Sequence, residues 1–171
     1  MKIAVTGRPG IGKTTLCMKV FNTLKDVEGF VTLEVRERGR RIGFKLHDLK
    51  SGYELWLARI GEGYPRVGKY VVFLENLNRF ANRIEEYEGC LIVIDEVGPM
   101  ELKSDKFVEA MKNIIESEKN LLVTVHYKSK HPIVEMIRRK FELYVIDERN
   151  RNYVAKEIIR RFEDVCGGRE S

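Results

Sequence analysis

A glycine-rich stretch near the amino terminus, Gly7 to Thr14, constrains the fold of this chain more than any other feature. It has the pattern Gly, four residues, Gly-Lys-Thr, and it lies between an apolar run over 3–5 and a helical periodicity over 16–24. Glycine lets consecutive backbone N–H groups point into one hollow, and such a hollow binds phosphate oxygens. Because chance glycine-rich turns rarely have both flanks, the stretch predicts a strand, a phosphate-binding loop and a helix.

The residue types in this loop have separate tasks. The new helix offers unpaired N–H groups and the positive end of its dipole, and Pro9 stiffens the loop. Lys13 supplies a mobile cation for the β- and γ-phosphates, and Thr14 offers a hydroxyl to Mg²⁺. We therefore expect one continuous set of residues to bind the nucleotide: Gly7, Arg8, Pro9, Gly10, Ile11, Gly12, Lys13, Thr14 and Thr15.

An apolar run over 90–94 ends in two acids, Asp95 and Glu96. Its continuous hydrophobicity is typical of a parallel strand with both faces covered. A strand that simply reaches solvent would also place acids there. Together with the upstream phosphate loop, however, the pair predicts that Asp95 holds Mg²⁺, directly or through water, and that Glu96 activates a water as a base. Lys13 and Glu96 are thus the expected catalytic residues, and Thr14 and Asp95 the expected metal ligands.

Length and composition fit one ordinary domain over residues 1–171, with 43% hydrophobic and 33% charged residues. The apolar runs are too short to cross a bilayer, and the first residues read as a strand rather than a signal peptide, so we expect a cytoplasmic monomer without a membrane partner. The net charge of +5 permits contact with nucleic acid, but no recognition motif supports it. The absence of Gln and the richness in Lys, Arg and Glu suit a thermophile.

Three cysteines, Cys17, Cys90 and Cys166, stand at wide spacings without a nearby His to complete a metal set. We expect them to be reduced, mostly buried thiols.

Between the phosphate loop and the acid pair, the hydrophobic period changes from about 3.6 to about 2 over 30–60. This predicts an antiparallel β-meander added to a parallel sheet, with the first helix ending at Gly29. The strand over 121–126 is expected between the strand of the phosphate loop and that of the acids. Further strands are predicted over 71–73 and 143–146, helices over 74–87, 105–117, 132–140 and 153–165, and a disordered tail over 167–171.

Three more segments have both a functional and a plain interpretation. The basic loop over 59–70 is either a solvated loop or a clamp on phosphate oxygens through Arg59, Arg66 and Lys69. His126, with Thr124 before it, is either a simple strand end or a sensor of the γ-phosphate. The polar turn over 147–152 is either a cap or a seat for the base and ribose. Its candidate base contacts are Arg149, Asn150 and Asn152.

Four stretches together carry a resemblance: Gly-Arg-Pro-Gly-Ile-Gly-Lys-Thr-Thr at 7–15, Arg-Gly-Arg-Arg-Ile-Gly-Phe at 38–44, Arg-Val-Gly-Lys-Tyr at 66–70 and Ile-Asp-Glu-Val-Gly-Pro-Met-Glu-Leu at 94–102. They resemble the cancer-related nucleoside-triphosphatase family of small P-loop proteins. The resemblance implies a three-layer, RecA-like α/β fold with a mostly parallel sheet. It also implies Mg²⁺-dependent hydrolysis of ATP, GTP and other nucleoside triphosphates, with broad base tolerance, at the phosphate loop and the acid pair.

Two rival functions share the phosphate loop. A nucleotide or nucleoside kinase also needs it, but a kinase must exclude water, whereas an acid placed to activate water favours hydrolysis. A nucleotide-gated module that binds nucleic acid or protein is the second rival.

Overall fold

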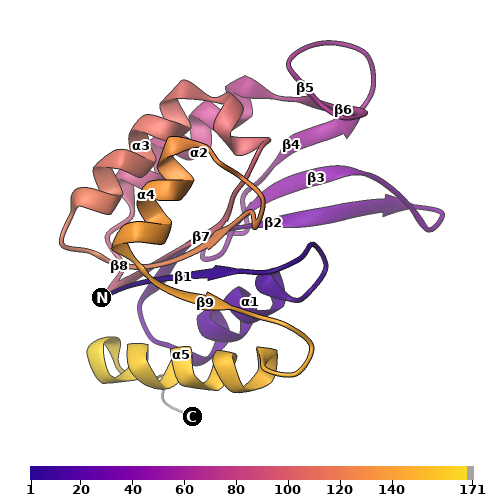
Figure 1. Cartoon of the computed structure of the whole chain (residues 1–171). Coiled ribbons are helices and arrows are strands. Elements are labelled where there is room, and N and C mark those ends of the chain that lie inside the picture. The colour runs from indigo at the N-terminus through magenta and orange to yellow at the C-terminus, as the bar shows by residue number, and fades with distance from the viewer. Residues whose placement is uncertain (169–171) are drawn as a thin grey trace.

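The computed structural model describes residues 1–168, in which a nine-stranded mixed sheet runs between two layers of helices (Figure 1). The strand order is β5-β6-β4-β3-β2-β7-β8-β1-β9. The parallel part consists of β2 (Val27–Glu37), β7 (Leu91–Val97), β8 (Asn120–Val125), β1 (Lys2–Thr6) and β9 (Glu142–Val145). The predicted place of the 121–126 strand, between the other two, is confirmed.

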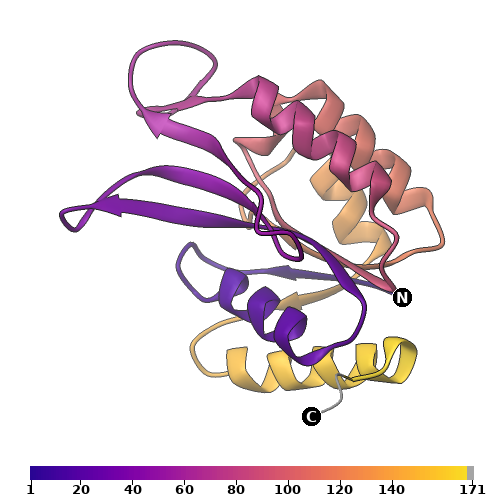
Figure 2. The ribbon, with the colours of Figure 1, turned by 180° about the vertical axis from the view of Figure 1, so that it is seen from behind.

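The antiparallel addition to this sheet is also confirmed. Its strands β3 (Arg40–Asp48), β4 (Glu54–Ile60), β6 (Tyr70–Val72) and β5 (Arg66–Val67) follow β2 at one edge. The β2–β3 hairpin projects beyond the helices in both views (Figures 1 and 2). The basic loop over 59–70 therefore contains a short paired strand and is not wholly irregular.

Helices cover both faces of the sheet. On one face lie α1 (Lys13–Thr23) and α5 (Arg151–Cys166), and on the other α2 (Leu74–Glu86), α3 (Asp105–Glu116) and α4 (Pro132–Lys140) (Figures 1 and 2). The predicted helices match these closely, except that α5 begins earlier than expected and α1 ends before Gly29. No helix in the part of the chain described is long and apolar enough to cross a membrane.

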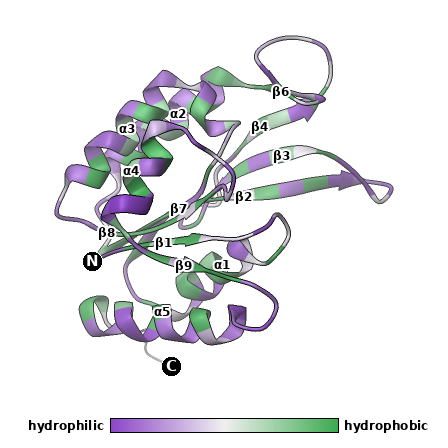
Figure 3. Cartoon of the chain, viewed as in Figure 1, coloured by the Kyte–Doolittle hydropathy of each residue, from purple (hydrophilic) through white to green (hydrophobic). Residues whose placement is uncertain are grey.

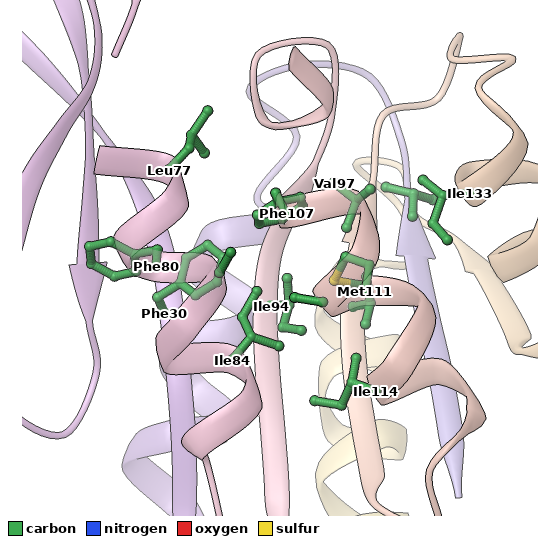
Figure 4. Close-up of a cluster of buried hydrophobic side chains, with 14 of the residues drawn as sticks. Phe30, Leu77, Phe80, Ile84, Ile94, Val97, Phe107, Met111, Ile114 and Ile133 are labelled. Atoms are coloured by element: carbon green, nitrogen blue, oxygen red, sulfur yellow. The ribbon is translucent and has the colours of Figure 1, made fainter. Parts of the chain in front are cut away.

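The core is divided by the sheet into two hydrophobic clusters. In the larger, the Phe30 ring of β2 packs edge-on against Phe80 of α2 at 5.3 Å and Phe107 of α3 at 6.3 Å (Figure 4). Figure 3 shows hydrophobic residues on the inner strands, most clearly on β1, while the helices carry both hydrophobic and hydrophilic residues. Because both faces of these strands are buried, their hydrophobicity is continuous rather than alternating.

The prediction that Gly29 ends the first helix is wrong. The helix α1 ends at Thr23, and Gly29 lies inside β2, opposite Val93 of β7. Its φ is +138°, and a Cβ atom there would stand 2.0 Å from the Val93 carbonyl oxygen. Glycine is therefore required for the close approach of two strands. From the sequence alone, such a glycine cannot be told from one that ends a helix.

The prediction of three reduced thiols is also wrong. A disulfide joins Cys90, just before β7, to Cys166 at the end of α5, and only Cys17 is free and buried. The two cysteines are 76 positions apart in sequence, so their spacing gave no hint of the contact. The start of the predicted disordered tail is paired as well, since Gly168 forms a β-bridge with Leu24. The rest of that tail, 169–171, lies outside the described residues.

Candidate active site

The phosphate loop connects β1 to α1 and bends sharply into the helix. Gly12 is the N-terminal cap of α1, with φ +114°, a conformation that a residue with a side chain rarely adopts. The Gly12 carbonyl accepts the first helical bond from Leu16 N at 2.9 Å. The amino end of α1 thus opens onto the cavity that Lys13, Thr14 and Thr15 line.

Lys13 is buried and is held at two points. Its Nζ atom donates to the Gly7 carbonyl at 2.8 Å and lies 3.3 Å from Oε2 of Glu96. The ammonium therefore bridges the loop and the carboxyl end of β7, where Glu96 stands partly exposed. This arrangement brings together the two residues that the sequence nominates for catalysis.

Asp95, the neighbour of Glu96, is 2% exposed and is surrounded by hydroxyl groups. Its Oδ2 atom accepts from Thr14 Oγ1 at 2.7 Å, and its Oδ1 atom accepts from Thr124 Oγ1 at 2.6 Å. Thr32 on β2 donates its hydroxyl to the Asp95 carbonyl at 2.9 Å. Burial raises the pKa of Asp95 to about 6, although the bonds from Thr124 and Thr14 favour the ionised form. Four elements, β2, β7, β8 and α1, thus meet at this carboxylate.

The sequence indicated one of these hydroxyl partners of Asp95 and not another. Thr124 stands in the strand whose end the sequence placed beside the phosphate loop, whereas Thr32 was missed. It occupies an ordinary position in an alternating strand, and only the parallel pairing of β2 with β7 brings it to Asp95.

Glu101 was missed as well. It begins the 3₁₀ helix Glu101–Lys103 and is 3% exposed, and burial, with the nearby Glu96 charge, raises its pKa well above the ordinary value. A Cβ atom at Gly98 would stand 3.1 Å from Oε1 of Glu96 and 3.3 Å from Oε2 of Glu101. The two carboxyl groups therefore crowd the same small space above Gly98.

A cavity of about 500 Å³ is lined by most of these groups, although Thr124 and Gly98 are not part of its wall. One half is lined by the phosphate loop and α1 (Pro9, Gly10, Gly12, Lys13, Thr14, Thr15), by the acids Asp95, Glu96 and Glu101, by Thr32, which is bonded to Asp95, and by His126. The other half is lined by β2, the added strands and the loop after β7: Leu33, Glu34, Arg41, Phe44, Leu57, Val67, Pro99 and Met100. His126 thus reaches the cavity as its sensor role requires, and burial lowers its pKa.

The three basic residues considered as a phosphate clamp do not line this cavity. Their charged ends lie elsewhere: Arg59 over the Trp56 ring at 4.7 Å, Lys69 over the Tyr70 ring at 5.7 Å, and Arg66 on the carbonyls of its own loop. Arg41, which the sequence did not single out, lines the cavity instead.

A second cavity of about 320 Å³ adjoins the first at Gly12 and Thr15 and lies between α1 and the start of α5. It is lined by Gly12, Thr15, Leu16, Lys19, Arg151, Asn152 and Ala155. Of the candidate base contacts, Asn152 therefore lines a cavity. Asn150 instead closes its own turn, since it accepts from Asp147 N at 2.8 Å and donates to the Val145 carbonyl at 3.0 Å, and Arg149 is exposed. Arg151, which was not predicted, donates to the Ile11 carbonyl at 3.1 Å.

Residues 1–168 contain no cluster of three or more His, Cys, Asp or Glu side chains that could hold a metal ion by themselves. The Thr14 hydroxyl and the Asp95 carboxylate lie side by side at the end of the phosphate loop. Hard oxygen donors of this kind suit Mg²⁺, which keeps several waters and takes its other ligands from substrate phosphates.

Comparisons with known proteins agree with this geometry. A family profile described as NTPase matches residues 2–159. The nucleoside-triphosphatase THEP1 of Archaeoglobus fulgidus is 57% identical over 166 residues, which cover 95% of this chain and 99% of the relative. The THEP1 of Methanosarcina barkeri is 45% identical over 172 residues, which cover 96% and 99%.

Solved structures show the same fold. The crystal structure of THEP1 from Aquifex aeolicus superposes with a TM-score of 0.81 at 29% identity, covering 95% of this chain and 99% of that one. The solution structure of a human cancer-related nucleoside triphosphatase gives 0.79 at 32% identity, covering 95% and 97%. The chain therefore belongs to this family of P-loop nucleoside triphosphatases and is an enzyme that hydrolyses nucleoside triphosphates.

Proposed function

We propose that the enzyme is a Mg²⁺-dependent hydrolase of ATP, GTP and other nucleoside triphosphates, which it converts to the diphosphate and phosphate. The observation that carries this proposal is the meeting of Lys13, Thr14, Asp95 and Glu96 at one end of the cavity. A cation, a hydroxyl next to a carboxylate, and a second carboxylate are the groups that triphosphate hydrolysis requires.

In this proposal the backbone N–H groups between Gly7 and Thr15 bind the β- and γ-phosphates, and Lys13 leaves Glu96 to contact them. Thr14 and Asp95 hold Mg²⁺, which when bound supplies positive charge to the phosphate oxygens. Glu96, at the edge of the same space, accepts the proton of a water that attacks the γ-phosphorus. His126 stands near enough to the cavity to contact the γ-phosphate or that water.

The second cavity is the proposed seat of the ribose and base. It offers Asn152, Arg151 and the aliphatic stem of Lys19, without an aromatic wall or a set of amides that would select one base. Broad base tolerance follows, because phosphate contacts are shared by every nucleoside triphosphate.

The proposal extends to the setting of the enzyme: a single domain over residues 1–171, acting as a cytoplasmic monomer. A disulfide such as Cys90–Cys166 is rare in the cytosol of ordinary organisms but common in intracellular proteins of hyperthermophiles. A thermophilic source is therefore part of the proposal.

Phosphate release measured for the common nucleoside triphosphates, with Mg²⁺ and with EDTA, tests the proposal directly. We expect comparable release from purine and pyrimidine triphosphates and almost none with EDTA. Release that persists in EDTA would contradict the metal requirement, and activity confined to one base would contradict broad tolerance.

The two rivals have their own tests. γ-Labelled ATP incubated with a panel of nucleosides and nucleotides should give label only as free phosphate, whereas a labelled nucleotide would identify a kinase. For nucleic-acid gating, the rate should stay flat when RNA or DNA is added, at low and at high salt.

A further inference from the structure

The main cavity, about 500 Å³ in all, has an apolar wall that the hydrolytic mechanism does not use. Leu33, Phe44, Leu57, Val67 and Met100 form the far walls. Neither a phosphate group nor a water gains from contact with such walls, because both lose hydration there.

The far half is built by segments that the hydrolytic mechanism leaves unused. Phe44 comes from the 38–44 stretch, Val67 from the 66–70 stretch, and Met100 from the loop after the acid pair. These segments, separated in sequence, converge on one space beside Glu96. In the proposed function the ribose and base do not need this space, because they take the second cavity, which extends from Gly12 and Thr15 to Asn152.

Arg41 supplies the charged end of this space. Its Nε atom donates to the Tyr70 hydroxyl at 2.9 Å, and its guanidinium lies over the rings of Phe44 and Tyr70 at 5.2 and 5.8 Å. No carboxylate among residues 1–168 forms an ion pair with it. Glu34, an acid on the same half of the cavity wall, is already paired with Arg36 at 2.5 Å. Arg41 is thus oriented by aromatic contacts and keeps its terminal N–H groups for an anion.

Arg41 lies some way along the sheet from the phosphate site. Arg41 pairs with Arg36, which stands four positions along β2 from Thr32, the partner of Asp95. At about 3.3 Å per residue the backbones at these two positions are roughly 13 Å apart. The guanidinium itself lies over the Phe44 ring, and Phe44 pairs with Glu34, only two positions from Thr32. The space left between the guanidinium and the metal site therefore suits a molecule of one ring.

We infer that the far half of the cavity binds a second small molecule, a planar aromatic carboxylate, with its anion on Arg41, its ring between Phe44 and Met100, and its other end facing the γ-phosphate position. This inference deepens the proposed function and rests on it, because it takes the phosphate site as the near boundary of the pocket. An arginine fork that matches a carboxylate, together with aromatic and thioether walls, is the chemistry that recognises such a ligand.

The test uses the full chain with ¹³C-labelled methionine methyl groups and 4-methylbenzoate as the probe. Met100 lines the pocket, whereas Met18 and Met111 lie in the two hydrophobic clusters and serve as internal controls. We expect the Met100 signal, assigned with Met100→Leu, to shift and saturate in the millimolar range that a one-ring ligand reaches. The neutral analogue 4-methylbenzamide should bind roughly 10-fold more weakly, because it lacks the charge for Arg41.

Two variants, each with one of two adjacent arginines replaced, test the role of Arg41. Arg41→Ala should weaken binding of 4-methylbenzoate by roughly 10-fold, whereas Arg40→Ala, an exposed arginine outside the cavity wall, should bind the probe and hydrolyse ATP as the parent does. The inference is overturned if Met100 does not shift, if the benzamide binds equally well, or if Arg41→Ala binds as tightly as Arg40→Ala. It is also overturned if Arg41→Ala alone abolishes hydrolysis without any probe, because Arg41 would then contact the γ-phosphate itself. Phosphate release by the parent without the probe reports on the proposed function separately.

Discussion

The Nζ atom of Lys13 lies 3.3 Å from Oε2 of Glu96, so the cation expected on the phosphates is paired with the carboxylate expected to activate water. A bound triphosphate would compete with Glu96 for this ammonium. In the proposed mechanism, binding of the substrate and release of the base are therefore one event, and Glu96 becomes a free proton acceptor only when phosphate takes its partner.

Glu96→Gln removes the negative charge of this side chain and keeps its shape. We expect turnover to fall by roughly 10² to 10⁴, because an amide does not accept the proton of the attacking water. Nucleotide affinity should be retained, since Lys13 no longer has to leave an ion pair. Steady-state phosphate release and binding of a non-hydrolysable analogue measure the two effects. Glu62→Gln, an exposed exchange outside the cavity, is the matched control; hydrolysis at the parent rate in Glu96→Gln would remove Glu96 from the mechanism.

Gly98→Ala places a methyl group between two carboxyl groups, 3.1 Å from Oε1 of Glu96 and 3.3 Å from Oε2 of Glu101. Both side chains must move by a few tenths of an ångström, and small displacements of catalytic groups are costly. We expect kcat to fall roughly 10-fold while the unfolding temperature changes little. Gly61→Ala, where a Cβ meets nothing within 4 Å, should leave both quantities unchanged. An unchanged kcat in Gly98→Ala would show that the position of Glu96 is not critical.

Tyr87→Phe tests a buried network far from the cavity. The Tyr87 hydroxyl donates to Oδ1 of Asp48 at 2.5 Å, and Ser51 donates its hydroxyl to Oδ2 at 2.6 Å. Burial opposes ionisation, but the bonds from Ser51 and Tyr87 and the Arg83 charge lower the pKa of Asp48 below its ordinary value. Loss of the tyrosine hydroxyl should cost about 1.5–3 kcal/mol in the free energy of unfolding at neutral pH, because the acceptor is charged.

The pH dependence of this effect has a definite sign. A lowered folded-state pKa stabilises the protein above the unfolded value, which is about 3.9 for aspartate, and this stabilisation is lost as the pH falls through the folded value. The difference between Tyr87→Phe and the parent should therefore shrink below about pH 4. Urea unfolding at several pH values measures it, with Tyr64→Phe, an 89% exposed tyrosine, as the control. A difference that stays constant into acid would contradict the role of the Asp48 charge.

Reduction of the Cys90–Cys166 disulfide should destabilise the protein without inactivating it. The bond closes a loop whose ends are 76 positions apart, for which the chain-entropy estimate is about 4.5 kcal/mol. Cys90 precedes the first residue of β7, whereas Glu96 lies near the last, so hydrolysis at moderate temperature should be unaffected. Unfolding temperatures with and without dithiothreitol measure the effect. The variant Cys90→Ala/Cys166→Ala should be indifferent to the reductant, and a parent equally indifferent would show that the bond does not form.

The sequence predicted what local patterns determine. The phosphate loop, the buried strand before Asp95 and the amphipathic helices follow from short-range periodicity, and so does the edge meander. Gly29 was misassigned because helix-ending glycines and glycines at a close strand contact look alike until Val93 is placed opposite. The Cys90–Cys166 pair depends on where the end of α5 meets the start of β7, which no spacing reveals.

The site was predictable to the same degree. Lys13, Asp95 and Glu96 stand in motifs, and the structure brings them together. Thr32, Glu101 and Arg41 reach the cavity only through the pairing of β2 with β7, the turn after β7 and the pairing of β3 with β2, respectively. In contrast, the loop cations Arg59, Arg66 and Lys69 looked free in sequence, yet aromatic rings and carbonyl groups hold them elsewhere.

The position of β1 in the sheet determines how late in translation this strand can pair with its neighbours. The strand that leads into the phosphate loop is made first, but its neighbours β8 and β9 begin only at Asn120 and Glu142. A nascent chain, growing at about 5–20 residues per second, therefore carries β1 unpaired for several seconds. The hydrogen bonds that fix the strand before the phosphate loop therefore form only late in translation, after Asn120 and then Glu142 have been made.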